Sequence, residues 1–581
     1  MRYRLAMPEP HTHLLHVETT VERPGSRVEL VLPVWTPGSY LVREYARHLE
    51  GVVAEDGEGR RLPVERVDKH RFVVEAGGAA RAVLRWRVYA NELTVRTCHL
   101  DGTHGYVNGA AVFPYARGRE REPHVVEVAA PPGWRVSTAL PGGPAEFTAR
   151  DYDELADSPL EIGTHRTVTF TALGKPHEIA VWGRGNLDEG RLAEDARKTV
   201  EALGALMGGL PYDRYLFILH LTDKRRGGLE HATSTTLNVQ RHGFFPRDAY
   251  EETLGLLSHE FFHVWNVKRL RPAAFVPYDY AREQYTRLLW WFEGATSYYE
   301  KAALARAGIL PPDRWLKSLG KALTSLERTP GARKMSIEEA SFLAWVKLYR
   351  PDENTPNSAI SYYLKGELVA FALDLALRRK GRSLDDVLRA LYARHAEGGV
   401  AEDGVERVVA ELLGPAEARA FFDRHVRGTA PLDLDLETIG VALRRRPASG
   451  FDDKGGAPFR NGDKPAAGFL GVDLAPGPKL AVASVREGSP AHRAGLYAED
   501  EIVAEDGFRV DRAQLWDRLC ERGPGGRLRL TVFRRDELVE VPVLLDPPPE
   551  DTVWLEPVPG ATPAQRAAFE AWSGGSWPAA G

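Results

Sequence analysis

The 581-residue chain lacks several features that would each place it in a particular class of protein. Its only two cysteines, Cys98 and Cys520, lie far apart, which is too few for a disulfide-stapled fold and suits a reducing compartment. No run of about 18 apolar residues occurs, and the first ten residues lack the apolar centre of a signal peptide. The net charge of −5 gives no basic excess for binding nucleic acid. We therefore expect a cytoplasmic protein with no membrane and no nucleic-acid partner.

The most informative segment present is His259-Glu260-Phe261-Phe262-His263. Histidines at i and i+4 lie on one side of a helix, and such a pair with a glutamate after the first histidine is typical of a zinc site that carries its own base. An apolar stripe that includes Leu254 and Leu257 is predicted on the opposite side. Asp248 is the expected N-cap, and Pro272 marks the expected end of the helix. The alternative interpretation is a pair of buried core histidines.

A catalytic zinc ion usually has three protein ligands, so the histidine pair requires a third. Two glutamates downstream, Glu283 and Glu293, are candidates. Glu293 lies in a tryptophan-rich segment where Thr286, Glu293, Ser297 and Glu300 would share one polar face of a helix. We choose Glu293 as the third ligand and Glu300 as a group that orients a ligand histidine. An ordinary ion-paired glutamate is the alternative for Glu300.

Four separated segments resemble the gluzincin aminopeptidases: Gly227 to His231, the histidine helix continuing to Arg269, the pair Glu293-Gly294, and Ser361 to Gly366. Together with a PDZ-like C-terminal region, they resemble the glycyl aminopeptidase family of PDZ-containing metallopeptidases. The resemblance covers most of the chain. It departs from the wider pattern at His231, where many relatives have asparagine.

This resemblance implies a zinc-dependent aminopeptidase that removes N-terminal residues from peptide substrates. Glu230 matches the glutamate that contacts the free amino group, and Gly228 allows a substrate to approach the backbone closely. Tyr363 matches the tyrosine that supports the oxyanion, with Tyr362 as the neighbouring candidate. Zinc lowers the pKa of its bound water to roughly 7, and Glu260 is the expected general base. The turn at Pro37 to Tyr40 is interpreted as structural, and a role in lining the cleft is the alternative.

The sequence patterns predict a multidomain α+β protein. We expect an N-terminal β domain (1–165), a thermolysin-like zinc catalytic domain (166–310), a helical domain (311–440), a flexible linker (441–465), a PDZ-like domain (466–546) and an aromatic-rich C-terminal tail (547–581) that packs on another part of the chain. The PDZ-like domain would take a peptide or protein C-terminus as its ligand.

Two alternatives to the aminopeptidase remain open at this stage. In one, the chain is a zinc endopeptidase and Glu230 only shapes the groove. In the other, it is a catalytically silent scaffold that uses its PDZ-like domain to hold partners. Cleavage of free-amine peptides compared with amine-blocked peptides, together with metal analysis, distinguishes these alternatives.

Overall fold

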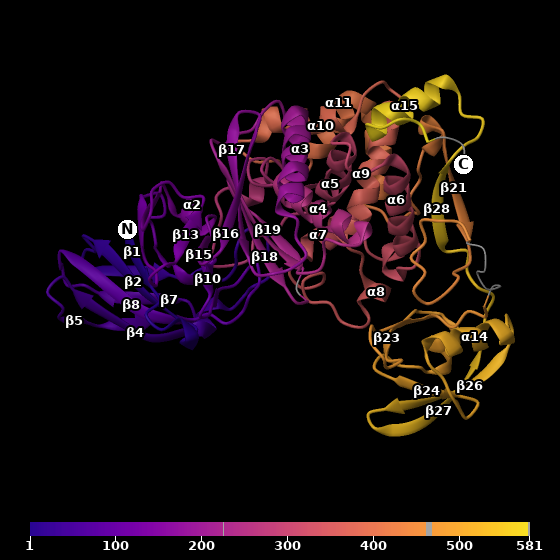
Figure 1. Ribbon diagram of the computed structural model, residues 1–581, viewed down its shortest axis with the longest axis horizontal. Coiled ribbons are helices and arrows are strands. Elements are labelled where there is room, and N and C mark those ends of the chain that lie inside the picture. The colour runs from indigo at the N-terminus through magenta and orange to yellow at the C-terminus, as the bar shows by residue number, and fades with distance from the viewer. Residues whose placement is uncertain (225, 460–466, 579–581) are drawn as a thin grey trace. The chain divides into compact units, whose positions relative to one another are not determined.

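The computed structural model describes residues 1–224, 226–459 and 467–578 of the chain (Figure 1). Two compact units are present. Unit 1 comprises Met1–Tyr285 with Arg389–Ala401, and unit 2 comprises Thr286–Leu388 with Glu402–Gly581. Unit 1 is β-rich at its N-terminus and unit 2 is largely helical, which confirms the predicted multidomain α+β class.

Residues up to about 165 of unit 1 form three sheets around one apolar core. The largest has the order β14 (Glu146–Ala149), β12 (His124–Ala129), β1 (Arg2–Ala6), β2 (Leu14–Glu22), β8 (Arg81–Tyr89), β4 (Leu49–Asp56), β5 (Arg61–Leu62). The second has the order β13 (Arg135–Thr138), β15 (Leu160–Gly163), β10 (His104–Val107), β9 (His99–Leu100), and the third the order β11 (Tyr115–Ala116), β3 (Arg27–Val31), β7 (Arg71–Glu75), β6 (Val64–Arg66). The short helices α1 (Gly109–Val112) and α2 (Tyr152–Ala156) belong to the same region.

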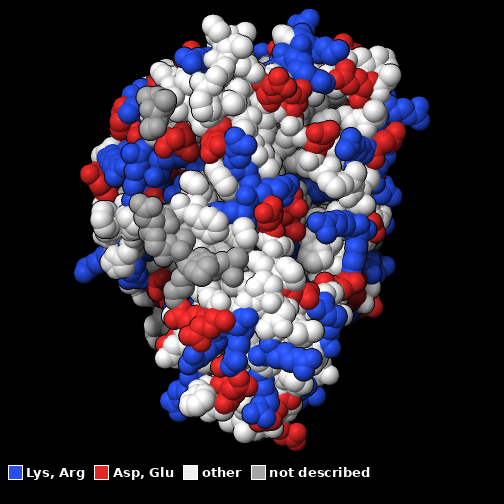
Figure 2. All heavy atoms as spheres, turned by 90° about the vertical axis from the view of Figure 1, so that its right-hand side faces the viewer, with Lys and Arg blue, Asp and Glu red and all other residues white. Residues whose placement is uncertain are grey.

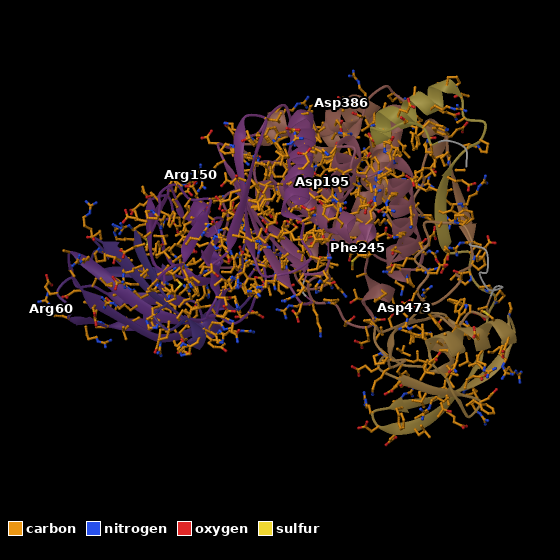
Figure 3. All side chains as sticks on the ribbon, viewed as in Figure 1. Arg60, Arg150, Asp195, Phe245, Asp386 and Asp473 are labelled. Atoms are coloured by element: carbon orange, nitrogen blue, oxygen red, sulfur yellow. The ribbon has the colours of Figure 1, made fainter. Side chains whose placement is uncertain are left out.

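A five-stranded sheet follows, with the order β16 (Arg166–Ala172), β17 (Lys175–Trp182), β18 (Tyr215–Thr222), β20 (Ser234–Gln240), β19 (Gly227–Glu230). Strand β18 is buried along its whole length, as expected for the centre of a sheet. Helices α3 (Glu189–Met207) and α4 (Arg247–Phe262) pack on each other. The Tyr250 hydroxyl of α4 donates to Asp195 of α3 at 2.8 Å, and Figure 3 labels Asp195. This contact fixes the helix that carries the histidines.

Helix α4 differs from the prediction at both ends. Its N-cap is Pro246, and Asp248 lies in the first turn without capping it, although a carboxylate there still suits the helix dipole. The helix stops at Phe262, so His263 is its C-cap and the chain continues in tight turns to Leu270. The predicted end near Pro272 was therefore wrong. Apolar residues after Phe262 recur at helical spacing in the sequence, but this segment folds as turns with buried side chains instead of a helix.

Unit 2 is built mainly from helices that surround α9 (Figure 1). Their bounds are the π-helix η4 (Trp290–Ala295), α5 (Thr296–Arg306), α6 (Pro312–Glu327), α7 (Ile337–Phe342), α8 (Thr355–Ser358), α9 (Tyr362–Arg378), α11 (Gly404–Leu413) and α12 (Pro415–His425). Helix α10 (Leu384–His395) begins in unit 2 and ends in unit 1. Since η4 starts at Trp290, Thr286 precedes the helix and cannot share a helical face with Glu293, contrary to our expectation.

The C-terminal module, residues 467–546, has its own apolar core. It contains β22 (Val472–Leu474), β23 (Val482–Val485), α13 (Pro490–Ala494), β24 (Glu501–Glu505), β25 (Phe508–Arg509), α14 (Arg512–Arg522), β26 (Arg527–Arg534) and β27 (Glu537–Leu544). On the face that Figure 2 displays, Lys and Arg side chains are interspersed with Asp and Glu side chains.

The segments on either side of this module pair with each other. Strand β21 (Val441–Arg446) lies where the flexible linker was predicted to begin, and it pairs along its whole length with β28 (Thr552–Pro557). The start of the predicted linker was thus wrong, because its backbone is used in a sheet. The final part of that linker, 460–465, lies outside the described residues.

The C-terminal tail packs on the helices of unit 2, as its aromatic residues predicted. Helix α15 (Pro563–Ser573) carries Trp572, which is fully buried and stacks on Trp315 at 4.1 Å between ring centroids. Its indole N–H donates to the Tyr298 hydroxyl at 3.0 Å. No helix among the described residues is long and apolar enough to cross a membrane. Both cysteines are free thiols.

Candidate active site

His259 and His263 lie at the end of α4, with their ring centroids 4.8 Å apart. Both side chains are buried. The Nδ1 atom of His263 donates to the carbonyl oxygen of Asn266 at 2.6 Å. This hydrogen bond fixes the tautomer and leaves Nε2 of His263 with a lone pair for a metal ion, an arrangement common among metal-ligating histidines. The sharp turn after α4 thus has a specific use, since it brings the Asn266 carbonyl back to the histidine.

Glu260 is buried beside strand β19, the edge of the five-stranded sheet. A Cβ atom built on Gly228 of this strand would lie 2.1 Å from Oε1 of Glu260, so any side chain there would displace the Glu260 carboxylate. Ligand atoms of Glu230, Glu260 and His263 all lie within 4.8 Å of one another. Unit 1 therefore gathers four of the expected site residues, namely Gly228, Glu230, Glu260 and His263, in one place.

The carboxylate of Glu230 is also buried, and its Oε1 atom has no hydrogen-bond partner among the described residues. The turn at Gly38 is packed against it: a Cβ on Gly38 would lie 2.5 Å from both carboxylate oxygens. Gly38 also has φ +90°, a conformation that favours glycine. The sequence favoured a structural role for this turn over a role in lining the cleft, because nothing local to it indicates a distant glutamate.

Asp157 forms hydrogen bonds with two residues that lie next to the site. This residue was not identified from the sequence. Its carboxylate accepts hydrogen bonds from His231 Nδ1 at 3.0 Å and from Lys268 Nζ at 2.6 Å. Burial would raise the pKa of Asp157, but the adjacent Lys268 and His231 hold that pKa at about 2. The ionised Asp157 therefore anchors His231, the neighbour of Glu230, to the segment after the metal helix.

In unit 2, Glu293 is buried in the π-helix η4, which packs directly on α9. Two glycines allow this close approach, since a Cβ on Gly294 would lie 2.5 Å from the Cα atom of Gly366. A π-turn is frequent at functional sites, where it offsets a side chain from the regular helical register. The Glu293-Gly294 and Lys365-Gly366 pairs in the sequence are thus two sides of one helix contact.

The tyrosine pair at the start of α9 lies near Glu293. Burial raises the pKa of Tyr363 well above its usual value, and the negative charge of Glu293 raises it further. The Tyr363 hydroxyl lies 3.5 Å from the Tyr349 hydroxyl. Tyr362 is fully buried, and its hydroxyl has no hydrogen-bond partner among the described side chains. Both phenols thus remain protonated and able to donate at neutral pH.

Two other glutamates, Glu300 and Glu283, are candidates from the sequence for a role near the metal. Glu300 lies 3.4 Å from Lys301 Nζ, and Lys301 also contacts Glu367 at 3.0 Å. Glu283 lies in an irregular segment of unit 1. Although His259 and His263 belong to the same unit, Glu283 is in none of the groups of potential metal ligands found among the described residues. Unit 1 thus gives no support to Glu283 as a ligand.

A helix with two histidines around a glutamate, next to an edge strand, defines a metallopeptidase. Residues 2–164 match the Peptidase M61 N-terminal domain, and residues 252–369 match the M61 glycyl aminopeptidase domain. The chain is 32% identical to an aminopeptidase N family protein from Idiomarina loihiensis, whose crystal structure superposes with a TM-score of 0.93 and covers 98% of this chain and 99% of that one. The chain belongs to the M61 glycyl aminopeptidase family. This confirms the expected zinc metallopeptidase with aminopeptidase activity.

Two more distant similarities were found. An M1 zinc metallopeptidase from Deinococcus radiodurans is 15% identical, with a TM-score of 0.48, over 74% of this chain and 94% of that one. A probable periplasmic serine endoprotease, DegP-like, from Chlamydia pneumoniae is 35% identical over 98 residues, which cover 14% of this chain. The match spans about a fifth (20%) of the length of that relative.

Proposed function

We propose that this enzyme hydrolyses the first peptide bond of peptides with a free N-terminus. In this proposal His259, His263 and Glu293 hold zinc, Glu260 is the general base, and Tyr363 supports the oxyanion. Glu230 pairs with the substrate amine. The observation that carries the proposal is the buried carboxylate of Glu230, which has an oxygen without a donor and lies within 4.8 Å of atoms of Glu260 and His263.

The donor set fits zinc. Imidazole nitrogen and carboxylate oxygen are ligands that zinc accepts, and because Nδ1 of His263 donates to Asn266, Nε2 is the nitrogen that would ligate the ion. Glu293 is preferred to Glu283 because Glu293 is buried in a π-turn, whereas Glu283 joins no ligand group. Zinc bound there would supply a water with a pKa near 7 and would polarise the scissile carbonyl. Glu300 is retained as a group that orients a ligand histidine.

The remaining chemistry belongs to the side chains. Glu260 would take a proton from the attacking water and later return it to the leaving amine, so no covalent intermediate is required. Tyr363, kept protonated by burial, would donate a hydrogen bond to the oxygen that becomes negative. Strand β19 is the edge of its sheet, where a peptide could lie as an added strand, and Gly228 leaves room beside that edge for the Glu260 carboxylate.

Glu230 explains why the N-terminus of the peptide would be selected. A buried carboxylate oxygen without a donor is costly, and the protonated amine of a substrate would offset this cost with a charge-assisted hydrogen bond to Oε1 of Glu230. Such a pair positions the first peptide bond over the metal site. An acetylated amine is neutral and larger, so it cannot replace the cation.

The test compares free and N-acetylated versions of the same short peptides with wild type and Glu230→Gln, which keeps the shape and removes the charge. Wild type should cleave only the free peptide, after its first residue. Glu230→Gln should lose at least about 10²-fold in kcat/KM on the free peptide, as expected for an unpaired buried charge partner. Wild-type cleavage of both peptides at internal bonds would establish the endopeptidase instead. A zinc-loaded protein with no turnover would establish the silent scaffold.

We also propose that residues 466–546 form a PDZ-like domain that binds a peptide or protein C-terminus. Support comes from a groove of about 310 Å³ lined by the loop Gly468–Gly471 and by Trp516 and Leu519 of α14. Phe451 of the preceding segment also lines this groove, with its ring centroid 5.3 Å from that of Trp516. A Phe451→Ala variant should therefore bind a C-terminal peptide library more tightly than wild type, and no binding by either protein would refute the proposal.

The domain boundaries and the cellular compartment remain part of the same proposal. A thermolysin-like catalytic domain at 166–310 is supported by the order of the five-stranded sheet and α4. A cytoplasmic location is supported by the two free thiols of Cys98 and Cys520.

A further inference from the structure

A second group of histidines surrounds one buried carboxylate in unit 1, away from the candidate active site. Glu161 on β15 is fully buried. Its Oε1 atom lies 2.9 Å from Nδ1 of His104 on β10, and its Oε2 atom lies 2.9 Å from Nε2 of His220 on β18. Nδ1 of His165 lies 4.0 Å from the Glu161 Oε1 atom. All four side chains are buried.

The hydrogen bonds around His220 determine which of its nitrogens carries a proton. Asn238 donates through Nδ2 to the Leu93 carbonyl oxygen at 3.3 Å, so its Oδ1 atom is the one that faces Nδ1 of His220, at 2.9 Å. An oxygen there accepts a proton from Nδ1. Nε2, the other ring nitrogen of His220, therefore faces the carboxylate of Glu161.

His165 shows the same arrangement. Ser137 Oγ donates its hydrogen to Glu178 at 2.8 Å, so it accepts from Nε2 of His165 at 3.0 Å. Nδ1 of His165 then carries a lone pair, and it has no hydrogen-bond partner among the described residues. Ligand atoms of His104, Glu161 and His220 thus lie within 4.8 Å of one another in a buried site, and Nδ1 of His165 faces the same carboxylate, so a cation between them would satisfy all four groups.

We propose that His104, Glu161, His165 and His220 form a second, structural zinc site. Three imidazoles and one carboxylate are a donor set for zinc, and a closed site with four protein ligands is typical of a structural rather than a catalytic ion. His165 and His220 each donate their outer N–H to an oxygen, as ligating histidines commonly do.

A zinc ion at this cluster would help to position the strand that carries the active-site residues. His104, Glu161 and His165 belong to the N-terminal β region, whereas His220 lies on the central strand of the five-stranded sheet. The ion would tie these two parts together across more than 100 residues of chain. Strand β20 pairs with β18 on one side and with β19 on the other, so the tie would also stiffen the edge that carries Gly228 and Glu230.

Zinc content measured by mass spectrometry tests the proposal without relying on activity. In His259→Ala/His263→Ala, which removes the active-site histidines, one equivalent of zinc should remain after dialysis. Adding Glu161→Gln should reduce it below about 0.1 equivalent, since loss of the carboxylate removes both a ligand and the neutralising charge. Adding His177→Asn instead should leave one equivalent, because His177 is a buried histidine of the same sheet that bonds to the Tyr212 hydroxyl at 2.9 Å.

A second measurement on the wild-type enzyme covers the case in which a variant fails to fold. One equivalent should be removed by a chelator from the folded protein, and a second should be released only when the protein is unfolded in the presence of a zinc-sensitive dye. A total of one equivalent in the wild-type protein, or zinc retained in the variant with Glu161→Gln, would overturn the proposal. A total of one equivalent would mean that protons, rather than a metal ion, balance the charge of Glu161.

Discussion

Gly228 lies so close to Glu260 that a Cβ atom on the glycine would be 2.1 Å from the Oε1 atom of the glutamate. The other glycine of the pair, Gly227, is different, since the nearest atom to its Cβ would be Arg96 Nη1 at 3.6 Å, an ordinary contact. Two adjacent glycines therefore have different roles. Gly228 defines the space in which the Glu260 carboxylate lies, whereas Gly227 has room for a side chain.

Gly228→Ala should therefore inactivate the enzyme without removing its metal. The added methyl group displaces the Glu260 carboxylate, and loss of a general base costs about 10²- to 10⁴-fold in kcat. Zinc content should stay near that of wild type, as in Glu260→Gln. Gly227→Ala is the matched control and should keep most of the activity. Similar kcat values for the two alanine variants would show that Glu260 is not held by this contact.

The choice of third ligand leads to a second prediction. Zinc content should fall sharply in Glu293→Ala, because two imidazoles alone hold zinc weakly, and should stay near normal in Glu283→Ala. Both variants are checked by metal analysis after dialysis, with circular dichroism to confirm folding. The reverse result would make Glu283 the ligand and would require another role for the buried π-turn around Glu293.

The sequence predicted the chemistry of the site better than its surroundings. The sequence singles out the histidine motif and Glu293 because zinc ligation imposes a spacing within one helix and a carboxylate in an otherwise apolar segment, and their roles as ligands stay predictions. Asp157, which accepts hydrogen bonds from His231 and Lys268 beside the site, was missed, and the packing of Gly38 on Glu230 was not predicted. Their contacts join residues more than 70 positions apart in the chain, and no local pattern encodes such a pairing.

Element boundaries failed where tertiary contacts replaced local preferences. The segment after Phe262 keeps helical spacing but turns so that the Asn266 carbonyl can accept from His263. Strand β21 was assigned to a linker because its partner, β28, follows more than 100 residues later. In both places the deciding hydrogen bonds come from a part of the chain that a short sequence window does not contain.

A third prediction concerns pH. Lys268 and His231 hold the pKa of Asp157 at about 2, below its unfolded value of 3.8, so its contribution to stability is complete above pH 4 and is lost as the pH falls towards 2. A shift of this size corresponds to roughly 2 to 3 kcal/mol. The difference in urea unfolding free energy between wild type and Asp157→Asn should be constant from pH 7 to 5 and should shrink as the pH falls below 4. A difference that grows on acidification would contradict this assignment.

The tyrosine pair gives a fourth prediction. Tyr363→Phe should lower kcat by about 10²- to 10³-fold, as found when one oxyanion donor is removed elsewhere, with little change in zinc content. Tyr362→Phe is the matched control, because it removes a neighbouring hydroxyl that is fully buried. Peptide hydrolysis is measured for both variants. If only Tyr362→Phe loses activity, Tyr362 is the donor and Tyr363 positions it.

The last prediction separates the C-terminal module from the segments that flank it. Excision of residues 467–546, with a short glycine-serine connection in their place, should leave zinc binding and short-peptide hydrolysis near wild type, because the module has its own core. Truncation after residue 459 should instead lower the melting temperature strongly. It removes β28, the partner of β21, and Trp572, whose ring stacks on Trp315 at 4.1 Å. Loss of one buried tryptophan costs about 3 to 5 kcal/mol, so Trp572→Ala in the full chain should reproduce much of the destabilisation. Thermal unfolding of the three proteins provides the comparison. An excised protein as unstable as the truncated one would show that the module itself, rather than the returning strand and helix, stabilises unit 2.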